Sequence, residues 1–156
     1  MNPRSIVGMP VVSVAEAGKL GYVTDLLYGL NPLCIPAVRV HGDDDELIVP
    51  FDTVGSIGSD AITVRDQSAA SPFTSLSSDG LIGEKEIHAL KIVDESGTFL
   101  GTVKSVEIEP SSGRVRRISS ERGGVMGVGA EVRTFEADAI RHVGREIVTV
   151  ADAAIA

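Results

Sequence analysis

Short apolar runs alternate with turn-forming residues along the whole chain. In the N-terminal half, runs rich in β-branched residues occur at 11–14, 21–28, 34–40, 47–50 and 61–64. The C-terminal half follows the same plan at 87–93, 99–109, 114–119, 131–135 and 147–150. Glycine, proline and clustered aspartates separate the runs, which is typical of strands joined by turns. The pattern predicts five or six short strands per half, with short helical turns only at 50–54 and 135–143.

An internal repeat relates the two halves. Residues 54–64 align without a gap with residues 140–150, including a shared glycine and a closing Thr-Val pair. Residues 18–26 align with residues 97–106, with one extra residue after the first glycine. We also pair the two openings, Ile6-Val7-Gly8 with Leu81-Ile82-Gly83. Self-similarity of this kind indicates two copies of one structural unit.

The repeat divides the chain into a first copy at 5–66 and a second at 81–151, joined by a serine-rich linker at 67–80. A unit of this size has a marginal core of its own, so we expect the two copies to pack together as a pseudo-symmetric pair. No segment has a long helical period. This favours an all-β fold of two tandem small β-barrels with short helical turns.

The second strand of each copy contains an irregular step. Its apolar positions run from Val23 to Leu26 in the first copy and from Val103 to Val106 in the second, an odd spacing in both. Alternation in a strand requires an even spacing between residues on one face. We therefore predict a bulge or a sharp bend at both places, as the closure of a small barrel requires.

Several motifs occur in the same order in both copies. The first copy has Gly8, Gly-Lys-Leu-Gly-Tyr-Val-Thr-Asp at 18–25, Leu-Ile-Val-Pro at 47–50 and Ile-Gly opening 57–64. The second has Gly83, Asp-Glu-Ser-Gly-Thr-Phe-Leu-Gly-Thr-Val at 94–103 and Val-Gly opening 143–150. This order resembles the PRC-barrel family, which includes the barrels of the photosynthetic reaction centre H subunit and of the ribosome maturation factor RimM.

The resemblance implies two PRC-type barrels, and in that family the barrel is a docking module rather than a catalytic centre. The second copy departs from the family pattern at two places. Arg133-Thr134-Phe135 precedes its last helical turn where the family has a proline, and Ser105 stands where the first copy has Asp25.

Charge and composition narrow the function classes. The chain has 14 Lys and Arg against 22 Asp and Glu, a net charge of −8, which argues against non-specific binding to DNA or anionic membranes. No apolar run approaches the roughly 18 residues that span a bilayer, and we find no signal-peptide core. We therefore expect a soluble, cytoplasmic protein without membrane insertion.

The sequence offers no catalytic constellation. Cys34 is the single cysteine, and His41, His88 and His142 are scattered, so neither a disulfide nor a zinc site is expected. The glycine-rich stretch 123–129 lacks the lysine and hydroxyl residue of a phosphate-binding loop, and no nucleophile motif is present. We expect no enzyme activity, no metal and no cofactor.

Two groups of residues are candidates for contact with a partner. Val125, Met126 and Val128 lie in the glycine-rich stretch, where exposed apolar side chains would mark an interface. Positive charge is concentrated in the second copy at Arg114, Arg116, Arg117 and Arg122. These arginines have three interpretations: cross-strand pairing with nearby glutamates such as Glu107, Glu109 and Glu121, contact with an acidic protein, or contact with RNA.

The sequence thus favours a protein-binding adaptor or docking module for a larger complex, acting alone or as a homo-oligomer such as a dimer. Two alternatives stay open: a ribosome- or RNA-associated maturation-type factor, and a barrel that senses a small ligand or metal. The identity of the partner does not follow from the residues.

Overall fold

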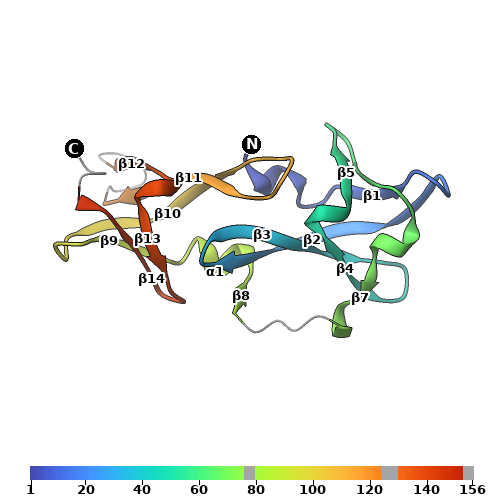
Figure 1. Ribbon diagram of the computed structural model, residues 1–156, viewed down its shortest axis with the longest axis horizontal. Coiled ribbons are helices and arrows are strands. Elements are labelled where there is room, and N and C mark those ends of the chain that lie inside the picture. The colour runs from blue at the N-terminus through green and yellow to red at the C-terminus, as the bar shows by residue number, and fades with distance from the viewer. Residues whose placement is uncertain (76–79, 124–129, 153–156) are drawn as a thin grey trace.

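The fold is described from a computed structural model, which covers residues 1–75, 80–123 and 130–152. Two curled β-sheets lie end to end, the N-terminal one at the right of Figure 1 and the C-terminal one at the left. The helical elements of the described residues are short; the only α-helix among them is α1 (Glu84–Ile87). The predicted all-β fold is confirmed.

Among the described residues, the first sheet has eight strands. Along its main path the order is β5 (Val54–Ile57), β6 (Ile62–Val64), β1 (Pro10–Ser13), β2 (Gly18–Leu30), β3 (Leu33–His41), β4 (Glu46–Pro50) and β7 (Ser71–Pro72). The eighth strand, β8 (Leu81–Ile82), pairs with β2 beside this path.

The second sheet has six strands in the described part of the chain. Their order is β13 (Ile140–Val143), β14 (Ile147–Val150), β9 (Lys91–Asp94), β10 (Phe99–Ile108), β11 (Val115–Arg122) and β12 (Glu131–Glu136). This is the order of the corresponding strands from β5 to β4 in the first sheet. Each sheet also has one parallel pair at the same place, β1 with β6 and β9 with β14.

The predicted bulges are present in both sheets. The register of β2 against β3 shifts between Val23 and Asp25, and that of β10 against β11 shifts between Val103 and Ser105. The extra residue restores the inward direction of the next apolar side chain, so Leu26 and Val106 are both buried.

The two predicted helical turns are also present. The 3-10 helices η2 (Phe51–Thr53) and η5 (Ala137–Ala139) connect β4 to β5 and β12 to β13. These strands stand at the two ends of the six-strand path in each sheet and are not hydrogen-bonded to each other. Each turn therefore connects, along the chain, the first and the last strand of the six-strand path.

The sequence patterns placed several short elements wrongly or missed them. Helix α1 reaches Ile87, which we expected to open a strand, and β13 lies within the stretch expected to be helical. Strands β5, β7 and β8 were not predicted. Segments of two to four residues are too short for a period of 2.0 or 3.6 to be distinguished.

The two openings correspond differently from the pairing that the glycines suggested. The Val23 N–H donates to Met9 O at 2.9 Å, and the Val103 N–H donates to Leu90 O at 3.0 Å, so Met9 corresponds to Leu90. Gly83 then stands at the N-cap of α1, as Asn2 does for η1 (Pro3–Ile6), and it does not correspond to Gly8. A three-residue match with one glycine was too short to fix the register.

Each opening crosses to the opposite sheet. The Ile108 N–H in β10 donates to Met1 O at 2.8 Å, while β8 pairs with Tyr28 and Gly29 of β2. Buried side chains from both sheets form one continuous core, which includes Ile6, Tyr28, Ile87, Ile108 and Phe135. The two halves thus pack as the sequence led us to expect.

Part of the segment expected to be a linker joins the first sheet. Strand β7 pairs with Leu47 and Ile48 of the edge strand β4. Phe73, in the 3-10 helix η4 (Phe73–Ser75), packs on a small cluster with Ile48, and the Arg39 guanidinium lies 4.2 Å from its ring centroid. These contacts cover an edge that would otherwise expose unpaired backbone groups.

Candidate functional site

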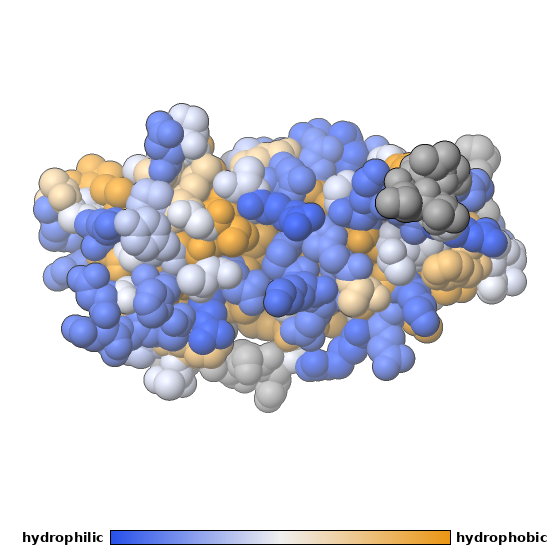
Figure 2. All heavy atoms as spheres, turned by 180° about the vertical axis from the view of Figure 1, so that it is seen from behind, coloured by the Kyte–Doolittle hydropathy of each residue, from blue (hydrophilic) through white to orange (hydrophobic). Residues whose placement is uncertain are grey.

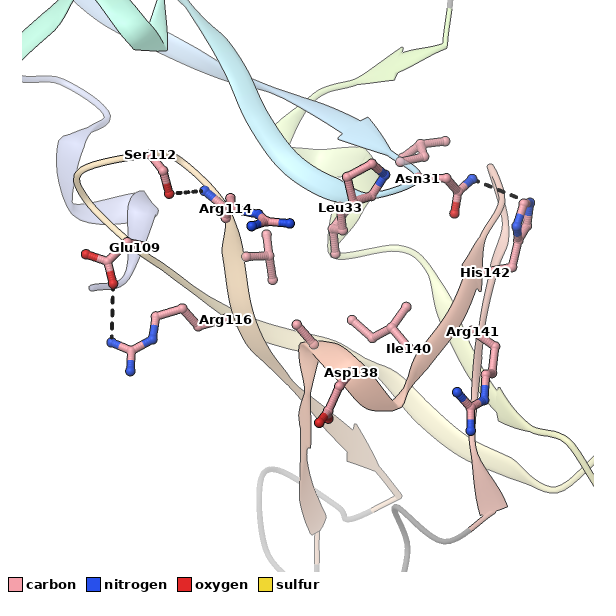
Figure 3. A pocket seen from close by; sticks show the side chains of 14 residues that line it. Asn31, Leu33, Glu109, Ser112, Arg114, Arg116, Asp138, Ile140, Arg141 and His142 are labelled. Carbon is pink, nitrogen blue, oxygen red and sulfur yellow. Dashed lines mark hydrogen bonds and ion pairs between the residues drawn. The ribbon is translucent and has the colours of Figure 1, made fainter.

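A pocket of about 650 Å³ lies where the turn between β2 and β3 meets the second sheet (Figure 3). The first half contributes Leu30, Asn31, Pro32 and Leu33. The second half contributes Glu109, Ser112, Arg114, Val115, Arg116, Ala137, Asp138, Ile140, Arg141 and His142. The pocket therefore combines an apolar interior with several charged side chains and depends on both halves.

Asn31 fixes one side of this pocket. Its Nδ2 donates to Val143 O at 2.9 Å, and the Val143 N–H donates to Asn31 Oδ1 at 2.9 Å. The side-chain amide thus pairs with strand β13 as a neighbouring strand would. His142 Nε2 lies 3.4 Å from the same Nδ2, which places its ring at the rim of the pocket (Figure 3).

The other side of the pocket is fixed where β3 meets the start of β11. Cys34 and Arg114 form an antiparallel bridge, and the Ile35 N–H donates to Gly113 O at 2.8 Å. A Cβ on Gly113 would lie 2.7 Å from Ile35 O and 3.0 Å from the Phe51 ring, and its φ is 78°. Only glycine fits here, so the two hairpin turns approach closely.

Arg114 differs from the other arginines of the pocket. Arg116 Nη1 lies 3.8 Å from Glu109 Oε2, and Arg141 Nε lies 3.3 Å from Glu95 Oε1. Figure 3 shows Arg116 turned toward Glu109, while Arg114 extends toward the turn of the first half. Within 1–75, 80–123 and 130–152, its guanidinium has no ion pair.

The remaining arginine candidates have partners outside the pocket. Arg117 Nη1 lies 2.8 Å from Glu107 Oε2, and its Nε lies 3.3 Å from Glu136 Oε1. Burial raises the pKa of Glu107, but Arg117 and the N-terminal amine outweigh it and leave that pKa lowered. The Arg122 guanidinium lies 5.9 Å from the Phe99 ring centroid. The pocket thus brings together only Arg114 and Arg116 of the four.

Three candidate residues are not described by the structure, and several residues of the pocket were not indicated by the sequence. Val125, Met126 and Val128 lie outside the described residues. Sequence reasoning missed Asn31, Asp138 and Arg141, and considered His142 only as one of three scattered histidines. The Asn-Pro dipeptide at 31–32 signals a turn, but nothing in the sequence places that turn against β13.

A second polar cluster lies at the junction of the two halves. The Tyr28 hydroxyl, fully buried, donates to Glu84 Oε2 at 2.7 Å, while His88 Nε2 lies 2.7 Å from Glu84 Oε1 and Arg4 Nε lies 3.4 Å from that oxygen. The hydrogen bond with Glu84 raises the pKa of His88, and burial raises the pKa of Tyr28. The Glu84 N–H donates to Asp25 Oδ1 at 3.0 Å. These contacts tie α1 to β2.

The described residues contain no group of three or more His, Cys, Asp or Glu side chains that could hold a metal ion. Among the same residues, no helix is long and apolar enough to cross a bilayer.

The described surface is mixed in polarity. Figure 2 shows one face on which polar side chains surround scattered apolar ones. The exposed large apolar side chains come from both sheets, from the turn after β1 and from the first opening. They are Val7, Val14, Tyr22, Phe99, Val132 and Ile147.

Most of the residues that line the pocket lie, together with the bulged strand β10, within one matched segment. Residues 81–153 match the PRC-barrel domain. The PRC-barrel segment contains β8, α1 and the whole second sheet. Except for Asn31, every polar residue that lines the pocket belongs to it. No curated protein shows a significant match to the chain.

Proposed function

We propose that this chain is a non-catalytic docking module made of two PRC-type barrels, at 5–66 and 81–151, that binds a protein partner. The match of the second half supports a barrel module. The shared strand order and the equivalent bulges in β2 and β10 support a barrel of the same type in the first half. The expected homodimer stays a prediction, which light-scattering mass tests.

The observation that carries the docking proposal is a local reversal of charge. The whole chain has a net charge of −8, yet three arginines line one pocket, and one of them, Arg114, has no ion pair with the described residues. A basic, partly apolar recess on an acidic protein favours an acidic partner surface. Because Arg116 and Arg117 already have glutamate partners, fewer arginines are left to follow a phosphate backbone.

The experiment is capture of partners from the source lysate by the tagged full chain, with and without nuclease. The double variant Arg114→Gln, Arg116→Gln removes two positive charges from the pocket. The control Arg65→Gln, Arg145→Gln removes two from exposed positions elsewhere. We expect a nuclease-resistant protein partner whose recovery falls about tenfold with the pocket variant and is unchanged with the control.

Two results would contradict this function. Recovery of ribosomal proteins that disappears after nuclease treatment would favour the RNA-associated alternative. Equal recovery by both double variants would show that the pocket takes no part in docking.

A further inference from the structure

The two halves differ at one equivalent position that faces a hairpin turn of the other half. Strand β5 corresponds to β13 in the repeat, so Phe51 at the start of η2 corresponds to Ala137 at the start of η5. Phe51 is buried, and its ring packs on the backbone of Gly113, between β10 and β11. In the first half, an aromatic ring therefore fills the space between the helical turn and the opposing hairpin.

In the second half this space is only partly filled. Ala137 contributes a methyl group, and the opposing residue is Leu33 at the start of β3. The pocket of about 650 Å³ remains beside them, with Val115 and Ile140 as further apolar walls. An apolar cavity of about 150 Å³ already accepts a benzene molecule, so a phenyl side chain fits this pocket.

The charged residues that line the pocket indicate which chemical group would bind next to the phenyl side chain. The Arg114 guanidinium has no ion pair with the described residues, and a guanidinium binds a carboxylate through two parallel hydrogen bonds. Glu109 and Asp138 line the same pocket and would repel a doubly charged phosphate more than a single carboxylate. The recognised group is thus an acidic side chain next to an apolar one.

We propose that this pocket recognises a segment of a partner protein that presents an aromatic side chain next to Asp or Glu. The ring lies among Leu33, Val115 and Ile140, beside Ala137, where the other half uses its own Phe51. The carboxylate pairs with Arg114. This inference rests on the proposed docking function and specifies the chemistry of the docked segment.

The test is a titration of the uniformly ¹⁵N-labelled full chain, followed by amide chemical shifts. The probe is the capped dipeptide acetyl-Phe-Asp-amide. Acetyl-Phe-Asn-amide removes the charge, and acetyl-Ala-Asp-amide removes the ring. We expect saturable shifts at Leu33, Val115 and Ile140, with each comparison peptide at least about fivefold weaker than the probe.

Two variants separate the two parts of the recognition. Ala137→Phe places a phenyl ring at the position equivalent to Phe51, opposite Leu33 instead of a glycine, and should weaken probe binding by at least about tenfold. Arg114→Gln should reduce binding of the Asp peptide to the level of the Asn peptide, without changing binding of the Asn peptide. Arg145→Gln is the control of equal charge change and should bind as the wild type does. If Ala137→Phe does not fold, Arg114→Gln decides alone.

Equal binding of the three peptides, shifts confined to other regions, or wild-type binding by Arg114→Gln would overturn the inference. The docking function has a separate readout in partner capture. If Ala137→Phe captured the partner as well as the wild type, docking would stand and this pocket would be rejected as its site. Loss of capture together with loss of probe binding in this variant would support both.

Discussion

At the scale of single residues, two glycines allow the backbone of a neighbouring strand to approach closely. A Cβ on Gly21 would lie 2.2 Å from His41 O, and one on Gly101 would lie 2.4 Å from Glu121 O. Both glycines belong to the motif that repeats in the two halves. Their repetition therefore reflects a backbone contact that no side chain permits, rather than a ligand site.

Gly101→Ala should lower the free energy of unfolding by about 2–4 kcal/mol, because the backbone must move away from Glu121 and φ is +119°. Urea denaturation measures this loss. Gly97→Ala is the matched control, since Gly97 also has positive φ but nothing lies within 4 Å of its Cβ position. Gly97→Ala should lower the free energy of unfolding by only about 1 kcal/mol. Equal losses would show that the contact with Glu121 contributes nothing.

At the scale of elements, the regular features were predictable and the shortest ones were not. The odd apolar step in β2 and β10 predicted both bulges, because a strand must return its next apolar side chain to the core. Helix α1 was missed because it is held by a distant residue, Asp25, which accepts from the Glu84 N–H. The pocket was missed for the same reason: Arg114 and Asn31 line one pocket only because the two halves pack together.

Docking of the β2–β3 turn on β13 leads to a prediction at this scale. Asn31→Leu should cost about 1–3 kcal/mol of unfolding free energy, since it leaves the Val143 N–H and C=O without their side-chain partner. Amide hydrogen exchange at Val143 should become faster. The only other asparagine, Asn2, makes an exposed cap with the Arg4 N–H, and Asn2→Leu should leave exchange at Val143 unchanged. Unchanged exchange in both variants would contradict this role.

At the scale of the whole molecule, both halves share one core, and a titratable cluster lies across their junction. His88, Glu84 and Arg4 come from segments around the two openings, and Tyr28 comes from β2. The hydrogen bond to Glu84 raises the pKa of His88 in the folded protein. Protonated His88 therefore favours the folded state, and the junction is coupled to pH.

The sign of this coupling can be measured. The contribution of His88 is fully present below its unfolded pKa of about 6.5 and is lost as pH rises through the higher folded pKa. The urea midpoint of the wild type should fall across this window. His88→Gln should remove that part of the dependence, and His142→Gln, at an exposed position, should retain it. A wild-type slope that persists in His88→Gln would contradict the assignment.

The opening segment of each half packs on the sheet of the other half, and this exchange shows what the covalent link between the halves contributes. Met1 lies on β10 and β8 lies on β2, so each half completes the surface of the other. Two separate polypeptides exchanging such arms around a two-fold axis would form a swapped dimer. Here both halves belong to one polypeptide, and this covalent link raises the effective concentration of each arm near its acceptor. The two halves therefore associate like the subunits of a swapped dimer, but their association does not depend on the protein concentration.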